Sequence, residues 1–327
     1  MKLVEVIADA ALTDAVAGVA KLPEVEDLHV GPAGPDKRRT MRLLVADGSL
    51  QRILDKLQVV IGSQVNARIL VLPVEAALPH RPEAEDKKKP SAPTAREVLY
   101  NAVEKDVRLD LNYLVLVALS TVVAAIGLVE NNVAVVIGAM VIAPLLGPNL
   151  ALALGTALGD AALVRKAITT GAVGIALAIG LSIVLGALWP FPVVSAELLT
   201  RTDVGPSSIA LALAAGAAAV LSLTTGLPSV LVGVMVAVAL LPPAAALGLT
   251  IGHGRFDLAA GAALLLAVNV VCLNLASKLV FLLRGIRPRT WWAKEKARRA
   301  NMTYLVIWAL TLIVLVLLIY ARQSLAR

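Results

Sequence analysis

Long, uninterrupted apolar stretches fill the last two thirds of the chain and constrain its fold more than any other feature. From residue 111 onward, seven stretches are long enough to cross about 30 Å of hydrocarbon at about 1.5 Å per residue. The predicted spans are Leu111–Val129, Val133–Leu158, Ala167–Trp189, Ser207–Leu223, Pro228–Leu249, Leu258–Leu283 and Thr303–Tyr320. Because 58% of all residues are apolar and only 16% are charged, a soluble two-domain protein is excluded. The sequence predicts a polytopic α-helical membrane protein.

Residues 1–78 have a different pattern, in which short alternating apolar runs are separated by helical stripes. Runs typical of strands are Leu3–Ala8, Leu28–Val30, Met41–Val45 and Asn66–Leu72. Helical spacing appears at Leu12, Ala15, Val16, Val19 and Leu22, and again at Leu50, Ile53, Leu54, Leu57 and Ile61. The order βαββαβ predicts a small ferredoxin-like α/β domain.

A charged, proline-containing stretch separates this domain from the apolar region. Residues 79–93 include the run Asp86–Lys89 and predict a linker that does not pack. Residues 94–110 then carry an apolar residue at every fourth position, at Leu99, Val103 and Val107. This spacing among charges predicts an amphipathic helix at the membrane interface. The alternative is a cytoplasmic lead-in to the first span.

The formal net charge of +7 belongs to the apolar region, where 14 basic and 6 acidic residues follow residue 110. Most of the surplus lies in a basic segment, residues 284–302, with little aromatic interleaving, so nucleic acid is not an expected partner. Basic loops stay in the cytoplasm. This segment and Arg165–Lys166 therefore predict a cytoplasmic amino terminus in the plasma (inner) membrane. The last helix and tail, residues 303–327, then place the carboxyl terminus outside.

A segment of the second span recurs in the fifth. Aligning Val136–Pro148 with Leu231–Pro243 gives six identities in thirteen positions without a gap. The most informative identities are Gly138 with Gly233, Met140 with Met235 and Pro148 with Pro243. Because the repeating unit contains three crossings, its second copy must insert in the opposite sense. Residues 111–283 therefore predict a 3+3 inverted repeat, the plan of many secondary transporters.

Proline and glycine cluster where each repeated segment ends. Proline removes a backbone donor and clashes with the carbonyl four residues earlier, so both helices are expected to break there. Two broken helices meeting near the midplane, with amide side chains beside them, predict a substrate-binding site. Its expected residues are Gly138, Met140, Pro144, Gly147, Pro148, Asn149, Gly233, Met235, Pro242, Pro243, Asn269 and Asn274. The alternative is a pair of proline kinks packed against small residues, with no site.

The residues around the repeated segment also carry a family resemblance. They begin with Ala125-Ile126-Gly127-Leu128 and Asn131-Asn132, which precede V-V-I-G-A-M-V-I-A-P-L-L-G-P. This run resembles the hallmark of the "uncharacterised hydrophobic domain" family of prokaryotic membrane proteins, and the G-x-M and L-L-P-P of the fifth span are similar to a second hallmark. The resemblance covers about residues 95–285. It implies a multi-pass membrane protein with a domain of unknown function, and it supplies no activity or site residues.

Residues that carry other chemistry are sparse. Glu130, Asp160 and Asp257 fall at span ends, so a relay of carboxylates through the membrane is not expected. Lys278 is expected to extend along its helix to the membrane surface. A single cysteine, Cys272, and the absence of a metal-ligand spacing, a phosphate loop or a nucleophile motif predict no metal, no cofactor and no enzymatic activity.

The sequence therefore predicts an integral membrane transporter or permease for a small solute or ion. Its central site would lie at the second and fifth spans, and its cytoplasmic domain would regulate it. One alternative is a membrane-anchored ligand sensor or scaffold that acts through the ferredoxin-like domain, and another is an ion channel. The Gly/Ala-rich stretch Ala210–Val220 is typical of helix contacts, so we expect a homo-oligomer in the lipid bilayer.

Overall fold

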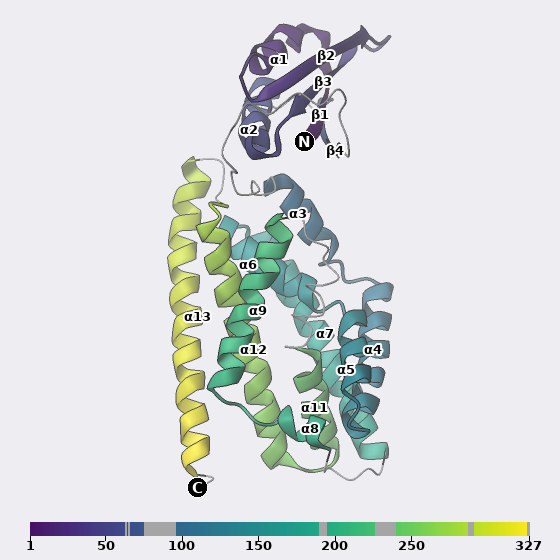
Figure 1. Ribbon diagram of the computed structural model, residues 1–327, viewed down its shortest axis with the longest axis vertical. Helices are drawn as coiled ribbons and strands as arrows, with labels where there is room; N and C mark the ends of the chain where they lie inside the picture. Colours follow the sequence, from purple (N-terminus) through teal and green to yellow (C-terminus); the bar gives the residue numbers. More distant parts are fainter. Residues whose placement is uncertain are drawn as a thin grey trace, which may run out of the picture. The chain divides into compact units, whose positions relative to one another are not determined.

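The computed structural model describes residues 1–62, 64, 66–74, 96–189, 195–225, 240–286 and 291–325. The chain divides into two compact units, Met1–Val98 and Leu99–Arg327 (Figure 1). The predicted linker lies outside the described residues, as do Gly233 and Met235 of the predicted site.

The amino-terminal unit is a four-stranded antiparallel sheet with two helices. Its elements are β1 (Lys2–Asp9), α1 (Thr13–Ala20), β2 (Val25–Ala33), β3 (Arg38–Val45), α2 (Leu50–Ile61) and β4 (Arg68–Pro73), with short 3₁₀ turns at Ala10–Leu12 and Asp47–Ser49. The strands lie in the order β2-β3-β1-β4. The predicted βαββαβ order is confirmed.

Strand alternation accounts for the core of this unit. Along β1, Val4, Val6 and Ala8 are fully buried, and the residues between them are not. Successive side chains point to opposite faces of a strand, so one face of the sheet is apolar. The helices cover that face, and α2 buries the whole predicted stripe of Leu50, Ile53, Leu54, Leu57 and Ile61.

The second unit is helical. Its helices are α3 (Arg96–Lys105, which begins just before the unit), α4 (Leu111–Val129), α5 (Val133–Ile142), α6 (Leu146–Leu158), α7 (Ala161–Leu188), α8 (Ala196–Thr200), α9 (Pro206–Thr225), α11 (Leu241–Gly252), α12 (Phe256–Leu283) and α13 (Trp291–Leu325). In Figure 1, α13 lies along α12 at one side, and α4 and α5 lie at the other.

Five of these helices are long and apolar enough to cross a membrane. The candidate spans are Leu111–Val129, Ala161–Leu188, Pro206–Thr224, Phe256–Leu283 and Leu305–Arg322. The pair α5 and α6 forms a sixth if a bent pair counts as one span. These helices are compatible with a multi-pass membrane protein. Of the predicted fifth span, the described part is the twelve-residue α11, and residues 226–239 lie outside the described residues.

The helix boundaries recur at a constant offset. Helices α4, α6 and α7 begin at residues 111, 146 and 161, and α9, α11 and α12 begin 95 residues later, at 206, 241 and 256. Helices α7 and α12 also end 95 residues apart, at Leu188 and Leu283. Figure 1 shows that α7 runs away from the α3 end of this unit, whereas α12 runs toward it.

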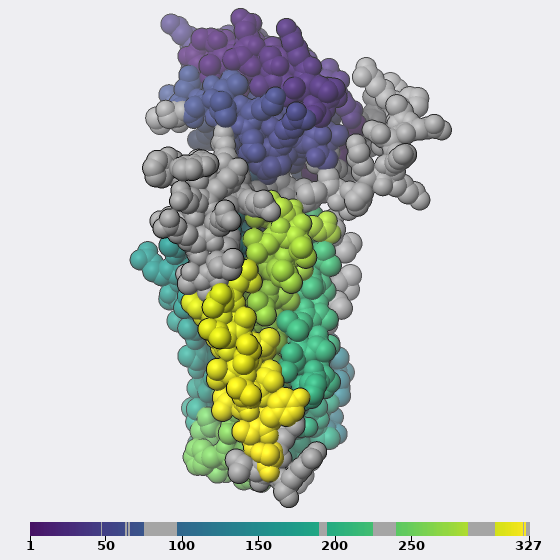
Figure 2. Space-filling model, turned by 90° about the vertical axis from the view of Figure 1, so that its left-hand side faces the viewer, coloured from purple at the N-terminus to yellow at the C-terminus, as the bar shows by residue number. Residues whose placement is uncertain are grey.

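Other helices of the unit cover the apolar side of α3 and of the segment that follows it. Leu99, Val103 and Val107 are almost fully buried in one cluster with Leu150 and Leu154 of α6. A separate cluster joins α13 to α9 and α12. In Figure 2, α13 covers this face of the unit, with α9 beside it.

Candidate functional site

The predicted break in the second span is present. Helices α5 and α6 meet at a bend of 53°, with Ala143–Leu145 between them. Proline disfavours a helical conformation in the residue before it. Ala143, which precedes Pro144, accordingly has φ −70° and ψ 118°, an extended conformation. The break is therefore a local consequence of Pro144.

Two of the predicted amides contact each other beside this break. The Nδ2 group of Asn149 donates to the Leu145 carbonyl at 2.9 Å. The Nδ2 group of Asn274 donates to Asn149 Oδ1 at 3.0 Å and to the Val270 carbonyl at 2.9 Å. Asn274 Oδ1 is buried and has no hydrogen-bond partner among the described residues. A buried acceptor in this state costs about 1–3 kcal/mol, so the pair is under-satisfied without a ligand or water.

Helix α11 begins inside the helical unit. Leu240 occupies its N-cap position without a side-chain hydrogen bond to the first turn, which contains Pro242 and Pro243. Proline suits the first turn of a helix because the amide there has no intrahelical acceptor. Pro242 and Pro243 carry no N–H, so this first turn has few free amides, and its positive character comes from the dipole of the helix.

The two helix starts belong to one apolar cluster. Leu145, before α6, and Leu240, before α11, are fully buried in one cluster with Met140 and Ala178. The two helix starts therefore share an apolar environment in the described residues. The segment before α11, residues 226–239, lies outside the described residues, so the predicted site between the two breaks stays a prediction.

A cavity of about 520 Å³ opens on the α11 side, between α8, α9, α11 and α12. Its polar lining comes from Thr200, Arg201, Ser207, Ser208 and Asn269, and its remaining walls are Leu211, Ala212, Ala214, Ala215, Ala218, Pro243 and Leu265. Two predicted site residues, Pro243 and Asn269, thus line one cavity. Its volume suits a small molecule.

Arg201 is the charged residue of the cavity lining. Its Nη2 lies 3.3 Å from Glu197 Oε2, and both side chains are about four-fifths buried, at 21% and 18% exposure. Its Nε is buried and has no acceptor among the described residues. Asn131 holds this segment in place, because its Oδ1 accepts from the Glu197 amide at 2.9 Å. Arg201 therefore presents a positive charge with one donor to spare.

The first half of the helical unit fills the corresponding space. Ser208, Pro243 and Asn269 lie 95 residues after Tyr113, Pro148 and Gly174. The Tyr113 hydroxyl donates to the Thr170 carbonyl at 3.0 Å, and a Cβ on Gly174 would collide with the Tyr113 ring. A tyrosine thus occupies in one half the volume that a serine leaves open in the other.

The remaining predicted residues that the structure describes do not line this cavity. Gly138 is exposed on α5, and Met140 is buried in the core. A Cβ on Gly147 would lie 2.7 Å from the Asp106 carbonyl oxygen, so this glycine permits a close backbone approach. Pro148 packs near Gly171 of α7.

Lys278 does not extend to the membrane surface, and that prediction is wrong. Its side chain is fully buried. The reason is the position of α12, of which 61% of the apolar window is buried, and Lys278 lies on the face of the helix that packs inside the unit.

Sequence reasoning missed Arg201 and the hydroxyls of Thr200, Ser207 and Ser208. They lie in α8, a five-residue helix between two spans, and in the first turn of α9. The signal that could have found them is the position of Arg201 between Thr200 and Thr202, shortly before Ser207 and Ser208 at the start of the fourth predicted span.

Two ionisable groups on α3 and just after it, Tyr100 and Asp106, have raised pKa values. Burial and a hydrogen bond to Asp160 raise the pKa of Tyr100 to about 12. Burial also raises the pKa of the Asp106 carboxyl. Both groups lie near the α3 end of the unit, away from the cavity.

Comparison with known proteins identifies a family whose description names no activity. The model of a family described as a domain of unknown function (DUF389) matches residues 140–275. An uncharacterized protein of Methanocaldococcus jannaschii is 36% identical over 282 residues, which cover 86% of this chain and 88% of that protein. No solved structure matches.

Proposed function

Because the chain belongs to the DUF389 family, whose description names no activity, we propose its function from the geometry alone: a membrane permease for a small anionic solute. The observation that carries this proposal is the cavity that Arg201 shares with the start of α11. Solute sites of secondary transporters form where interrupted helices point their positive ends at anionic groups.

The constant offset of the helices supports the two-state architecture that a permease needs. Helices α4, α6 and α7 correspond to α9, α11 and α12, and corresponding helices run in opposite directions. We interpret these as the two members of a 3+3 inverted repeat, with α13 as the additional span. The fifth span would then consist of residues 226–239 and α11, giving seven spans. Rocking of one repeat against the other would expose the site alternately to each side.

The charges around the cavity favour an anion. Arg201 is positive, and α11, whose Pro243 is in the lining, points the positive end of its helix dipole toward the cavity, although its two first-turn prolines supply no N–H donor. Hydroxyl groups of Ser207 and Ser208 and the amide of Asn269 supply hydrogen bonds. The lining contains no carboxylate among the described residues. Glu197 pairs with Arg201 but does not line the cavity, so a cation in the cavity would meet the arginine without a carboxylate to bind it.

The proposed orientation places the α3 end in the cytoplasm. Arg165 and Lys166 lie at that end, near the start of α7, and α12 ends at Leu283 and α13 begins at Trp291 there. Positive residues favour the cytoplasmic side. The amino-terminal unit would then be cytoplasmic and regulatory, and the carboxyl terminus would be outside. Removing residues 1–93 tests regulation: flux that is identical under all conditions with and without them contradicts it.

Uptake into proteoliposomes tests the permease proposal. Vesicles that contain the full chain are tested with labelled monocarboxylates, dicarboxylates and inorganic anions, and with sodium, potassium and an amine as cationic controls. The proposal predicts uptake of at least one anion above the level of protein-free vesicles, with no uptake of cations. It also predicts that Arg201→Gln lowers this uptake at least tenfold, whereas Arg255→Gln, at an exposed arginine paired with Asp257, does not. Background flux for every anion contradicts the proposal.

A further inference from the structure

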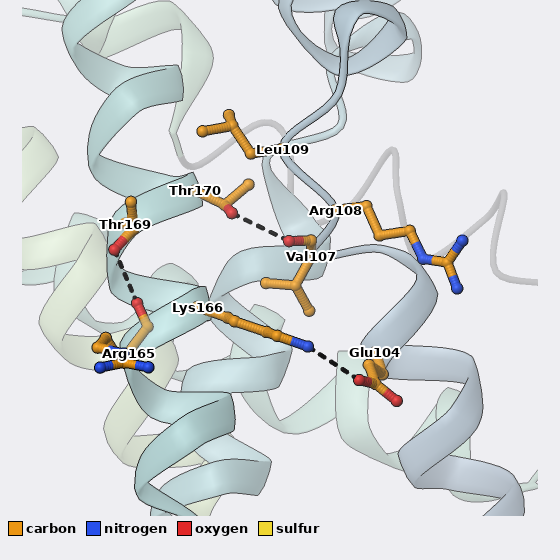
Figure 3. A pocket seen from close by; sticks show the side chains of 8 residues that line it. All are labelled: Glu104, Val107, Arg108, Leu109, Arg165, Lys166, Thr169 and Thr170. Carbon is orange, nitrogen blue, oxygen red and sulfur yellow. Dashed lines mark hydrogen bonds and ion pairs between the residues drawn. The ribbon is translucent and has the colours of Figure 1, made fainter.

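A basic pocket lies at the α3 end of the helical unit, separate from the cavity. Its volume is about 500 Å³, and α3, the segment after it and the first turns of α7 form its walls (Figure 3). Arg108, Arg165 and Lys166 line it together with a single carboxylate, Glu104. Positive side chains therefore exceed negative ones by two.

The hydrogen bonds of the pocket leave its arginines available. Lys166 Nζ lies 3.1 Å from Glu104 Oε1, so this pair is neutralised. Thr170 Oγ1 donates to the Val107 carbonyl at 3.0 Å. Arg108 and Arg165 form no ion pair in the part of the chain that the structure describes, and Figure 3 shows their side chains extending in different directions. Two guanidinium groups without an ion pair at one pocket suit an anion with several acceptor oxygens.

In the second half of the unit, a side chain of α13 occupies the corresponding place. Val107 and Lys166 lie 95 residues before Thr202 and Gly261. There the guanidinium of Arg322 donates from Nη1 to the Thr202 carbonyl at 3.3 Å and contacts the Gly261 position. The pocket in the first half is thus the open counterpart of a site that the second half fills from its own chain.

An apolar face next to the pocket, formed by Leu109, Leu111 and Ile168, is likewise exposed, whereas its counterpart in the second half is covered. Val204 is 4% exposed in the cluster with α13, whereas Leu109, 95 residues earlier, is 45% exposed. Leu111 at the start of α4 and Ile168 on α7 are 74% and 53% exposed. No helix of this chain covers the face among the described residues. An occupant that replaces α13 there must be apolar along the helices and anionic at the pocket.

We propose that the pocket binds the phosphate headgroup of an acidic phospholipid whose acyl chains lie on the exposed face of α4 and α7. Basic pockets beside membrane helices recognise such headgroups. A free phosphate would satisfy the arginines but would leave Leu109, Leu111 and Ile168 uncovered. The proposal requires that the spans lie in a bilayer, and it does not depend on transport.

Native mass spectrometry of the full chain in detergent tests this binding. The protein is titrated with phosphatidylglycerol, with phosphatidylcholine of the same acyl chains, and with inorganic phosphate. We expect one tightly retained phosphatidylglycerol, and weaker retention of phosphatidylcholine. At about fivefold per arginine, Arg108→Gln/Arg165→Gln lowers phosphatidylglycerol affinity about 25-fold. Arg255→Gln, an arginine before α12 at the other end of the unit, leaves it unchanged.

A charge-preserving double variant distinguishes a loss of positive charge from a folding defect. Arg108→Lys/Arg165→Lys should keep the preference for phosphatidylglycerol if positive charge is the cause. Equal retention of phosphatidylglycerol by the Gln double variant overturns the proposal. So does phosphate that displaces the lipid at equal concentration, because the apolar face would then contribute nothing. A dimer that forms in wild type and dissociates in the Gln variant assigns the face to a second copy and also overturns it.

Discussion

Gly147 and Gly138 belong to one glycine-containing segment, and the structure predicts opposite effects of a methyl group at each. A Cβ on Gly147 would lie 2.7 Å from the Asp106 carbonyl oxygen and 3.2 Å from its carbonyl carbon. These are backbone atoms, and Thr170 fixes the next residue through the Val107 carbonyl. Gly147→Ala should therefore act as overpacking and cost about 1–3 kcal/mol of unfolding free energy.

The assay is thermal unfolding in detergent, followed with a thiol-reactive dye. Cys272 is the single cysteine and is fully buried, so its reaction reports opening of the helical unit. At roughly 2–4 °C per kcal/mol, Gly147→Ala should lower the apparent Tm by roughly 2–12 °C.

The matched control is Gly138→Ala on α5. No heavy atom lies within 4 Å of the added Cβ, and replacing a glycine inside a helix with alanine stabilises it by about 0.5–1 kcal/mol. Its Tm should be unchanged or higher. If Gly147→Ala unfolds at or above the wild-type temperature, the close approach to Asp106 does not exist, and the reasoning is refuted.

Two further predictions concern hydrogen bonds. Asn274→Leu leaves Asn149 Oδ1 buried without its donor and should lower the free energy of unfolding by about 1–3 kcal/mol. The double variant Asn274→Leu/Asn149→Leu should lose less stability than the sum of the two single variants. Strictly additive Tm shifts would count against the contact. Burial and the hydrogen bond to Asp160 raise the pKa of Tyr100 to about 12. The neutral phenol therefore contributes its full share of the folding free energy below about pH 10, and this share is lost as the pH rises through about 12. Absorbance titration at alkaline pH should show that Tyr100→Phe removes a component near 12, and loss of a component near 10 would contradict this.

The local parts of the fold follow from the sequence because single residues determine them. Alternation of Val4, Val6 and Ala8 predicts a strand with one buried face, and Pro144 predicts the end of a helix. The third span shows a limit of the same reasoning. Charges at Arg165 and Lys166 place its predicted start at Ala167, but the helix begins at Ala161, six residues earlier. Asp160 caps it by accepting from two amides of the first turn, and Arg165 and Lys166 are exposed side chains of the second turn.

The cavity could not be predicted, because it depends on packing between distant segments. Asn269 and Pro243 are recognisable as candidates, but the open volume arises from Ser208, whose counterpart Tyr113 fills the same space in the first half. A small residue in an apolar helix more often marks a helix contact. The stripe of α3 shows the same ambiguity: Leu99 would look identical whether protein or lipid covered it, and the structure covers it with protein.

The central claim is that a solute passes through the cavity beside α11. The most direct test is anion uptake by Ser208→Tyr, which places in the second half the side chain that fills the first. Ala210→Tyr, at an exposed position on the same helix that does not line the cavity, is the control. Our account predicts that uptake by Ser208→Tyr falls to the protein-free level while uptake by Ala210→Tyr persists at equal protein content. Equal uptake by both variants would contradict it.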